Sequence, residues 1–261
     1  MTSDTHLDPD DLGQRSRFPG NRAVLDPRDA AGHRNALIDR IHRGALGRAI
    51  AETGAGRFAV AVDLGCGIGR LTPLLLEHAD AVVGLDPDEG MLARAREAHG
   101  SPRTTFAPPD AVPPLAPPVL VVSVYVLAQL PEAMVEEELA DLRARAGDGA
   151  HLVLIERIAH RPERAPVDIP ARTPRWYGAL LRRAGWEPVA SRRVRREVSV
   201  PVLLNARVAA RLPDAVGRPA SAAIAAAEQR LAGIGQRGSY VDLLMRARAG
   251  GPQGIPKHGR S

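Results

Sequence analysis

Short apolar runs alternate with segments of helical periodicity along most of the chain. Apolar runs of about 4–8 residues between loops favour buried strands, and residues 119–127 are the clearest example because valine and leucine dominate them. Seven segments are predicted as strands, at residues 58–64, 79–87, 104–106, 119–127, 150–158, 186–200 and 239–249.

Amphipathic helices are predicted between most of these strands. In residues 29–53, apolar residues recur at three- and four-residue steps and give the segment one apolar face. Residues 173–185 begin with Thr173 and Pro174, residue types that are favoured at the N-cap and at the first helical position. The other predicted helices cover residues 70–79, 88–99, 131–146, 202–212 and 219–232.

The alternation of strand and helix predicts an α/β fold with a parallel sheet and helices on both faces. The crossover at residues 108–118 departs from the alternation, because its prolines exclude a regular helix. Residues 202–232 depart from it as well, since they place two helices before the last strand. We therefore expect a helical insertion there, as a cap or as an oligomer contact.

The 261 residues are expected to form one domain at residues 21–249, with a core at 58–200. Residues 1–20 and 250–261 are rich in polar residues, proline and glycine, so both are predicted to be disordered tails. The chain is long enough to bury a substantial core without disulfides or metal.

The formal net charge of +5 comes almost entirely from arginine, since Lys257 is the only lysine. This charge has two interpretations, a surface for an acidic partner or a coding bias that loads any surface with arginine. Arg192, Arg193, Arg195 and Arg196 form the one cluster. Because basic residues are not interleaved with aromatic ones, binding of nucleic acid is disfavoured.

A single cysteine, Cys66, excludes an internal disulfide and suits a cytoplasmic protein. The polar N-terminus does not resemble a secretion signal, and no run of about 18 apolar residues predicts a membrane span. No cluster of cysteine and histidine suggests a metal site.

A glycine loop follows the first predicted strand, with Gly65, Gly67 and Gly69 at every second position before a helix. Such a loop lets a ligand approach the backbone at a helix N-terminus. Dinucleotide sites favour a third glycine where this chain has Arg70. The carboxylate of Asp63 would repel a pyrophosphate but could pair with an ammonium group.

Two further carboxylates follow strand ends. Asp86 lies about twenty residues beyond the loop, where an acidic side chain can accept both ribose hydroxyls. Asp110 follows the third strand, where a carboxylate could accept from an adenine amino group. Together with Asp63, these positions indicate a nucleoside ligand with an ammonium group.

The stretches VDLGCGIGRLT and VVGLDPDEGMLARAR resemble the first two motifs of class I S-adenosylmethionine-dependent methyltransferases. APPDAVPP is similar to the third binding segment of that family, and VLVVSVYVLAQLP to its fourth strand and the turn that follows. The resemblance extends over residues 58–200 and 239–248. It implies a Rossmann-like, seven-stranded, mostly parallel sheet with an antiparallel last strand, and S-adenosylmethionine as methyl donor.

The resemblance also implies roles for single residues. Asp63 would lie near the methionine ammonium, Asp86 would bind the ribose hydroxyls, and Asp110 would contact the adenine. The remaining positions expected at the donor are Gly65, Cys66, Gly67, Gly69, Pro87, Met91, Ala111 and Ser123. Many relatives carry histidine in the turn after the fourth strand, where this chain has Ala128 and Gln129, so no base is assigned there.

Residues for catalysis are less well defined, because methyl transfer depends chiefly on alignment and needs a base only for some acceptors. The candidate bases are His33, His42, Glu156 and His160; the alternative for Glu156 is an ion pair with an arginine. Aromatic residues make up only 3% of the chain, so Tyr125, Trp176 and Tyr177 are candidates for an acceptor pocket, with core packing as the alternative.

The sequence therefore predicts transfer of a methyl group to a hydroxyl or amine of a small molecule, as in bacterial tailoring reactions, with S-adenosylhomocysteine as the product. An RNA or protein acceptor, and a donor-binding partner protein without catalysis, remain alternatives. A nicotinamide-dependent oxidoreductase is disfavoured by Asp63 and Arg70. A homodimer is left open.

Overall fold

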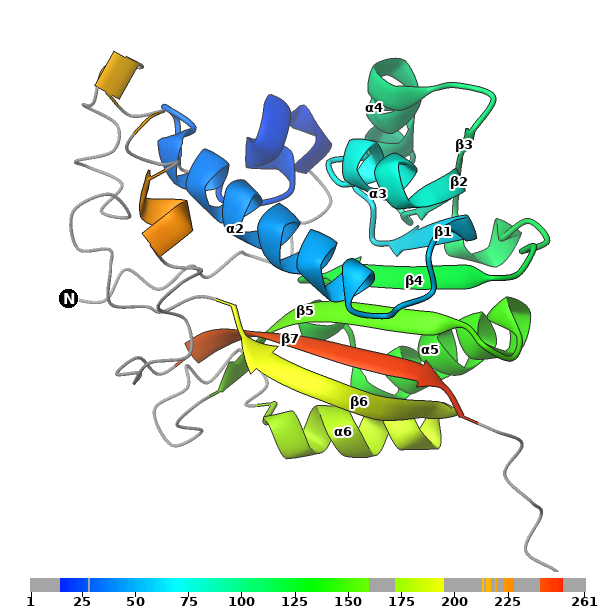
Figure 1. Cartoon of the computed structure of the whole chain (residues 1–261). Coiled ribbons are helices and arrows are strands. Elements are labelled where there is room, and N and C mark those ends of the chain that lie inside the picture. Colours follow the sequence, from blue (N-terminus) through cyan, green and yellow to red (C-terminus); the bar gives the residue numbers. More distant parts are fainter. Residues whose placement is uncertain are drawn as a thin grey trace, which may run out of the picture.

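The computed structural model describes residues 15–27, 29–159, 172–194, 213, 215–216, 219, 223–227 and 240–250. Its centre is a seven-stranded sheet in the order β3-β2-β1-β4-β5-β7-β6 (Figure 1). The strands are β1 Phe58–Leu64, β2 Ala79–Leu85, β3 Thr104–Ala107, β4 Val119–Val124, β5 His151–Ala159, β6 Trp186–Arg193 and β7 Tyr240–Ala249.

Strands β1 to β5 pair in parallel, and β7 pairs antiparallel with both β5 and β6. Because parallel strands need crossovers, helices cover both faces of the sheet. The predicted Rossmann-like, seven-stranded, mostly parallel sheet with an antiparallel last strand is confirmed.

The α-helices whose bounds lie within the described residues are α2 His33–Ala51, α3 Thr72–His78, α4 Glu89–His99, α5 Glu132–Ala146 and α6 Pro174–Arg183. Two of them begin at side-chain caps. Thr173 accepts a hydrogen bond from the backbone N–H of Trp176 at 3.2 Å, and Asp88 accepts from Gly90 and Met91. Each cap satisfies donors that the first turn of a helix leaves open.

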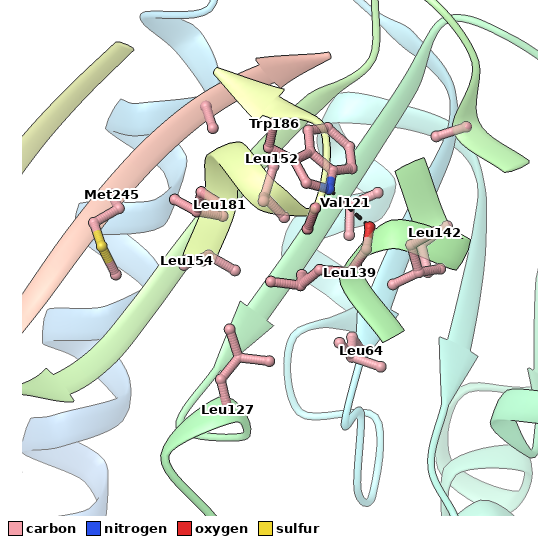
Figure 2. Close-up of a cluster of buried hydrophobic side chains, with 14 of the residues drawn as sticks. Leu64, Val121, Leu127, Leu139, Leu142, Leu152, Leu154, Leu181, Trp186 and Met245 are labelled. Atoms are coloured by element: carbon pink, nitrogen blue, oxygen red, sulfur yellow. Dashed lines mark hydrogen bonds between the residues drawn. The ribbon is translucent and has the colours of Figure 1, made fainter. Parts of the chain in front are cut away.

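The two faces of the sheet form separate hydrophobic clusters. α5 and α6 cover one face, where Trp186 is buried and donates through Nε1 to the carbonyl of Leu139 at 2.8 Å (Figure 2). α2 and α3 cover the other face (Figure 1). There Leu37 and Ile41 of α2 belong to one cluster with Val122 and Ile155. Alternating side chains of each strand therefore enter different clusters, as buried parallel strands require.

Several predicted boundaries differ from the structure by a few residues, and two of these differences have a physical cause that can be named. β4 ends at Val124 instead of residue 127, because Tyr125 has a φ of 63° and turns the chain into the 3₁₀ helix η4 Leu127–Gln129. Residues 15–20 have the composition of a disordered tail, but they form η1 Arg15–Arg17 and the start of η2 Gly20–Ala23. Arg94 on α4 fixes this segment by donating to the carbonyls of Ser16 and Phe18 at 2.8 Å.

The crossover at 108–118 carries only the 3₁₀ helix η3 Pro109–Ala111, as its prolines predict. Of the predicted insertion at 202–232, helical residues are described at 215–216, 219 and 223–227, where Ala225 packs into the cluster beneath α2. None of the helices in the described part of the chain has the length and apolar character to span a bilayer.

Candidate functional site

A cavity of about 270 Å³ opens at the carboxyl ends of β1, β2 and β4. Ligands of open α/β sheets bind at this edge, where the loops diverge. Its wall combines the glycine loop, the start of α4, the residues after β4 and the N-terminal 3₁₀ segment. Of the predicted donor residues, those that line it are Asp63, Gly65, Cys66, Gly67, Asp86, Pro87 and Met91.

The glycine loop adopts a backbone that other residues rarely adopt. Gly65, Gly67 and Gly69 have φ values of 70°, 53° and 74°, in the left-handed region. A Cβ on Gly67 would lie 2.4 Å from Cγ1 of Val24, and one on Gly65 would lie 2.1 Å from Cγ2 of Val126. These glycines therefore allow the N-terminal segment and the turn after β4 to approach the loop.

Asp63 is the buried carboxylate of the cavity. It is 2% exposed, and its Oδ2 accepts no hydrogen bond from the residues that the structure describes. Burial raises the pKa of Asp63 to about 7, a shift that Arg70 opposes and Asp86 reinforces. A buried acceptor without a donor is costly, so this oxygen is suited to a ligand that brings an N–H or a positive charge.

Asp86 closes the loop from the end of β2. One of its oxygens accepts from the backbone N–H of Gly67 at 2.9 Å, and the other accepts from that of Asp88 at 3.0 Å. Burial raises the pKa of Asp86, while these two hydrogen bonds lower it. Each oxygen keeps a second lone pair, so the carboxylate can still accept from a pair of hydroxyls.

Sequence reasoning missed the contribution of the N-terminal segment to the cavity. Arg15, Ala23 and Val24 line it, although this part of the chain has no apolar periodicity. Arg15 is 9% exposed and donates to the carbonyl of Leu25 at 3.2 Å. The glycines of the loop were the one available signal, because they indicate that other chain segments come close.

Tyr125 is the predicted acceptor residue that lines the cavity. Its backbone N–H donates to the carbonyl of Ile155 at 2.9 Å, which fixes the unusual φ. Its ring meets the ring of His42 edge-on, with centroids 4.8 Å apart. His42 is fully buried, and its Nε2 lies 3.8 Å from Oδ2 of Asp242.

Glu156 lies behind the turn after β4 and does not line the cavity. It is fully buried, and its two oxygens accept from the backbone N–H groups of Val126, Leu127 and Ala128 at 3.0–3.1 Å. Burial raises the pKa of Glu156 to about 7, although these N–H groups and Arg172 lower it. The carboxylate therefore supports the turn, and it forms no ion pair with its neighbour Arg157.

Several predicted residues are not brought to the cavity. The sequence predicts Trp176 and Tyr177 at the acceptor pocket, but both lie on α6, away from the cavity lining. They pack in the hydrophobic cluster between α6 and the sheet, and Trp176 donates to Glu132. Ser123 is fully buried in β4, and His33 is the buried first residue of α2. Asp110 and Ala111 are exposed on η3, Gly69 lies beyond the lining, and His160 falls outside the described residues.

Two further features of the described residues are their possible metal ligands and the thiol in the cavity wall. Within the described ranges, no group of three or more histidine, cysteine, aspartate or glutamate side chains could hold a metal ion. Cys66 is buried, and burial raises the pKa of its thiol, so the thiolate is disfavoured.

Comparison with known proteins places this site in a family. The methyltransferase domain family matches residues 61–148, which include the glycine loop, Asp86 and the turn after β4. No curated protein sequence matches the chain.

Three solved structures are similar to the chain at low identity, and they share its fold. A chain from the complex of the Haloferax volcanii Trm112 methyltransferase activator with a methyltransferase is 16% identical, with a TM-score of 0.56, over 86% of this chain and 96% of that one. Geranyl diphosphate C-methyltransferase from Streptomyces coelicolor is 11% identical, with a TM-score of 0.55, over 79% of this chain and 76% of that one. The [4+2]-cyclase SpnF is 18% identical, with a TM-score of 0.52, over 79% of this chain and 80% of that one.

The family match covers the loop that carries the cavity, and the strand order is that of the predicted family fold. Residues 61–148 therefore match a methyltransferase domain, within a seven-stranded sheet of the kind expected for S-adenosylmethionine-dependent methyltransferases.

Proposed function

We propose that this protein transfers the methyl group of S-adenosylmethionine to a hydroxyl or amine of a small molecule. The observation that carries the proposal is Asp63, whose Oδ2 is buried in the cavity wall without a hydrogen-bond donor among the described residues. The donor carries an ammonium group, which supplies both the charge and the N–H groups that this oxygen lacks.

The other residues of the cavity wall suit the ribose, the adenine and the methionine portion of the donor. Asp86 has acceptor capacity left for the two ribose hydroxyls, and Pro87 and Met91 line the wall beside it, where the adenine would pack. Gly65 and Gly67 line the cavity without a side chain, so the methionine portion could approach the loop backbone closely. A nicotinamide dinucleotide fits less well, because Asp63 and Asp86 would face its pyrophosphate.

The protein's contribution to the reaction is alignment. When bound, the donor supplies a methyl group on a good leaving group, so the fold must chiefly hold the acceptor atom in line. Tyr125 lines the cavity and is fixed by contacts with α2 and β5, which suits a positioning residue. Glu156 is occupied by the turn after β4, so we do not assign it as the base.

A small molecule is the acceptor we favour. An RNA or protein acceptor is suggested by the arginine cluster at residues 192–196. Of these arginines, Arg192 forms an ion pair with Glu52 at 2.5 Å, and Arg193 lies on the other face of the sheet, so the two do not form one basic surface. Arg195 and Arg196 lie outside the described residues. The Streptomyces neighbour is, by its name, a methyltransferase of a small molecule, geranyl diphosphate, which supports the same choice. SpnF is a cyclase, so this fold also carries other reactions.

Calorimetric titration with S-adenosylhomocysteine tests the donor site. We expect micromolar binding, and we expect Asp86→Ala to weaken it about 100-fold because two charge-assisted hydrogen bonds are lost. A protein that is folded by circular dichroism but does not bind would contradict the proposal. Binding without methylation of any acceptor would favour the partner protein without catalysis.

A further inference from the structure

Arg157 differs from most other partly buried arginines of this protein. Arg34 binds Asp26, and Arg70 binds Asp39, each at 2.6 Å. Arg157 is half-buried too, but among the described residues no carboxylate lies within 4.0 Å of it and no oxygen accepts its hydrogen bonds. Its guanidinium instead lies over the ring of Tyr125, with 5.5 Å from Cζ to the ring centroid. A ring contact replaces less of the lost hydration of a guanidinium than a carboxylate does.

The position of Arg157 connects it with the donor cavity. It lies near the carboxyl end of β5, on the face that α2 covers, because Ile155 two residues earlier packs in that cluster. Tyr125, whose ring it contacts, lines the cavity. A group bound to Arg157 would therefore lie next to the residue that borders the donor.

The neighbouring acid, Asp242, forms no ion pair with Arg157 within 4.0 Å. Asp242 is directly opposite it in the β5–β7 pairing, but the Asp242 carboxylate lies beside Nε2 of His42 instead. His42 in turn contacts the ring of Tyr125. Arg157 therefore has no ion-pair partner among the described residues, and its guanidinium is available to an anionic ligand.

We propose that Arg157 binds an anionic group of the acceptor, a carboxylate or a phosphate. A guanidinium presents N–H groups in a planar fork that matches two oxygens of either anion. The inference rests on the proposed function and narrows its substrate class to small molecules that carry a negative charge near the methylated atom.

Arg193 offers a matched control. It is also partly buried and has neither ion pair nor hydrogen bond among the described residues, but it is paired with Leu243 on the α6 face of the sheet. Arg193→Gln therefore removes the same charge away from the cavity, whereas Arg157→Gln removes it beside Tyr125.

The experiment uses the full chain and a small-molecule extract of its native host, separated on an anion-exchange resin into anionic and non-anionic fractions. Each fraction is incubated with methyl-labelled S-adenosylmethionine. We expect label only from the anionic fraction, and a KM for the acceptor that rises about 10- to 100-fold in Arg157→Gln with little change in kcat. Arg193→Gln should match the wild type, and all three proteins should bind S-adenosylhomocysteine equally.

Label from the non-anionic fraction alone, or equal kinetics of Arg157→Gln and wild type, would overturn the inference and leave the proposed function standing. Binding of S-adenosylhomocysteine without label from the anionic fraction would overturn it as well. Failure to bind S-adenosylhomocysteine, in contrast, would remove the proposed function itself.

Discussion

The ends of β1 and β5 each bury one carboxylate, and the two carboxylates have opposite surroundings. Asp63 and Glu156 are both almost completely buried, and burial raises the pKa of each to about 7. Glu156 accepts three backbone N–H groups, whereas Oδ2 of Asp63 accepts none from the described residues. The comparison teaches that burial alone does not identify a ligand-binding carboxylate; what identifies it is unused acceptor capacity that faces a cavity.

The largest effect should come from Glu156→Ala. The substitution leaves three buried N–H groups of the turn after β4 without an acceptor, so we expect the free energy of unfolding to fall by about 3 kcal/mol. Chemical denaturation measures this change, and S-adenosylhomocysteine should still bind the folded fraction within about threefold of wild type. An unchanged midpoint would show that the turn does not depend on Glu156.

Asp63→Asn should weaken ligand binding and leave stability unchanged, the reverse of Glu156→Ala. Because the amide cannot neutralise an ammonium group, we expect the affinity for S-adenosylhomocysteine to fall about 10- to 100-fold. The melting temperature at pH 8 should not fall, since the substitution removes a buried charge that has no donor at Oδ2. Loss of stability with intact binding would reverse the roles that we give to the two carboxylates.

A pH titration gives the smallest and most specific effect. A folded-state pKa of about 7 means that Asp63 is protonated below pH 7, and an ammonium ligand binds its ionised form. Affinity for S-adenosylhomocysteine should therefore fall by up to about tenfold for each pH unit below 7 and level off above it. Calorimetry between about pH 5.5 and 8 measures this slope, and Asp63→Asn should abolish it; a slope that persists in the variant would assign it to another group.

The same contrast bears on what could be predicted from the sequence. The glycine loop, Asp63 and Asp86 are close in sequence and follow strand ends, so local pattern was enough to place them at one edge of the sheet. Trp176 and Tyr177 lie on a helix, so no strand end indicates where their side chains lie. Their rarity suggested a pocket, but helix periodicity gives only the face of α6 that is buried and not the sheet face that α6 covers.

The N-terminal segment could not be predicted for a different reason. Residues 15–20 have the composition of a disordered tail, and they are held by donations from Arg94 to the carbonyls of Ser16 and Phe18. Such bonds join backbone atoms to a side chain about 76–78 residues away and leave no local pattern in either segment.

The sequence by itself determined the class of fold, the seven strands and the glycine loop that lines the cavity, because periodicity and glycine act over a few neighbouring residues. Only the tertiary structure decided which carboxylate is satisfied by the backbone, which aromatic residue borders the cavity and which arginine lies over that residue's ring. These are properties of partners that the fold brings together from distant positions, such as Glu156 with the turn after β4 and Arg157 with Tyr125.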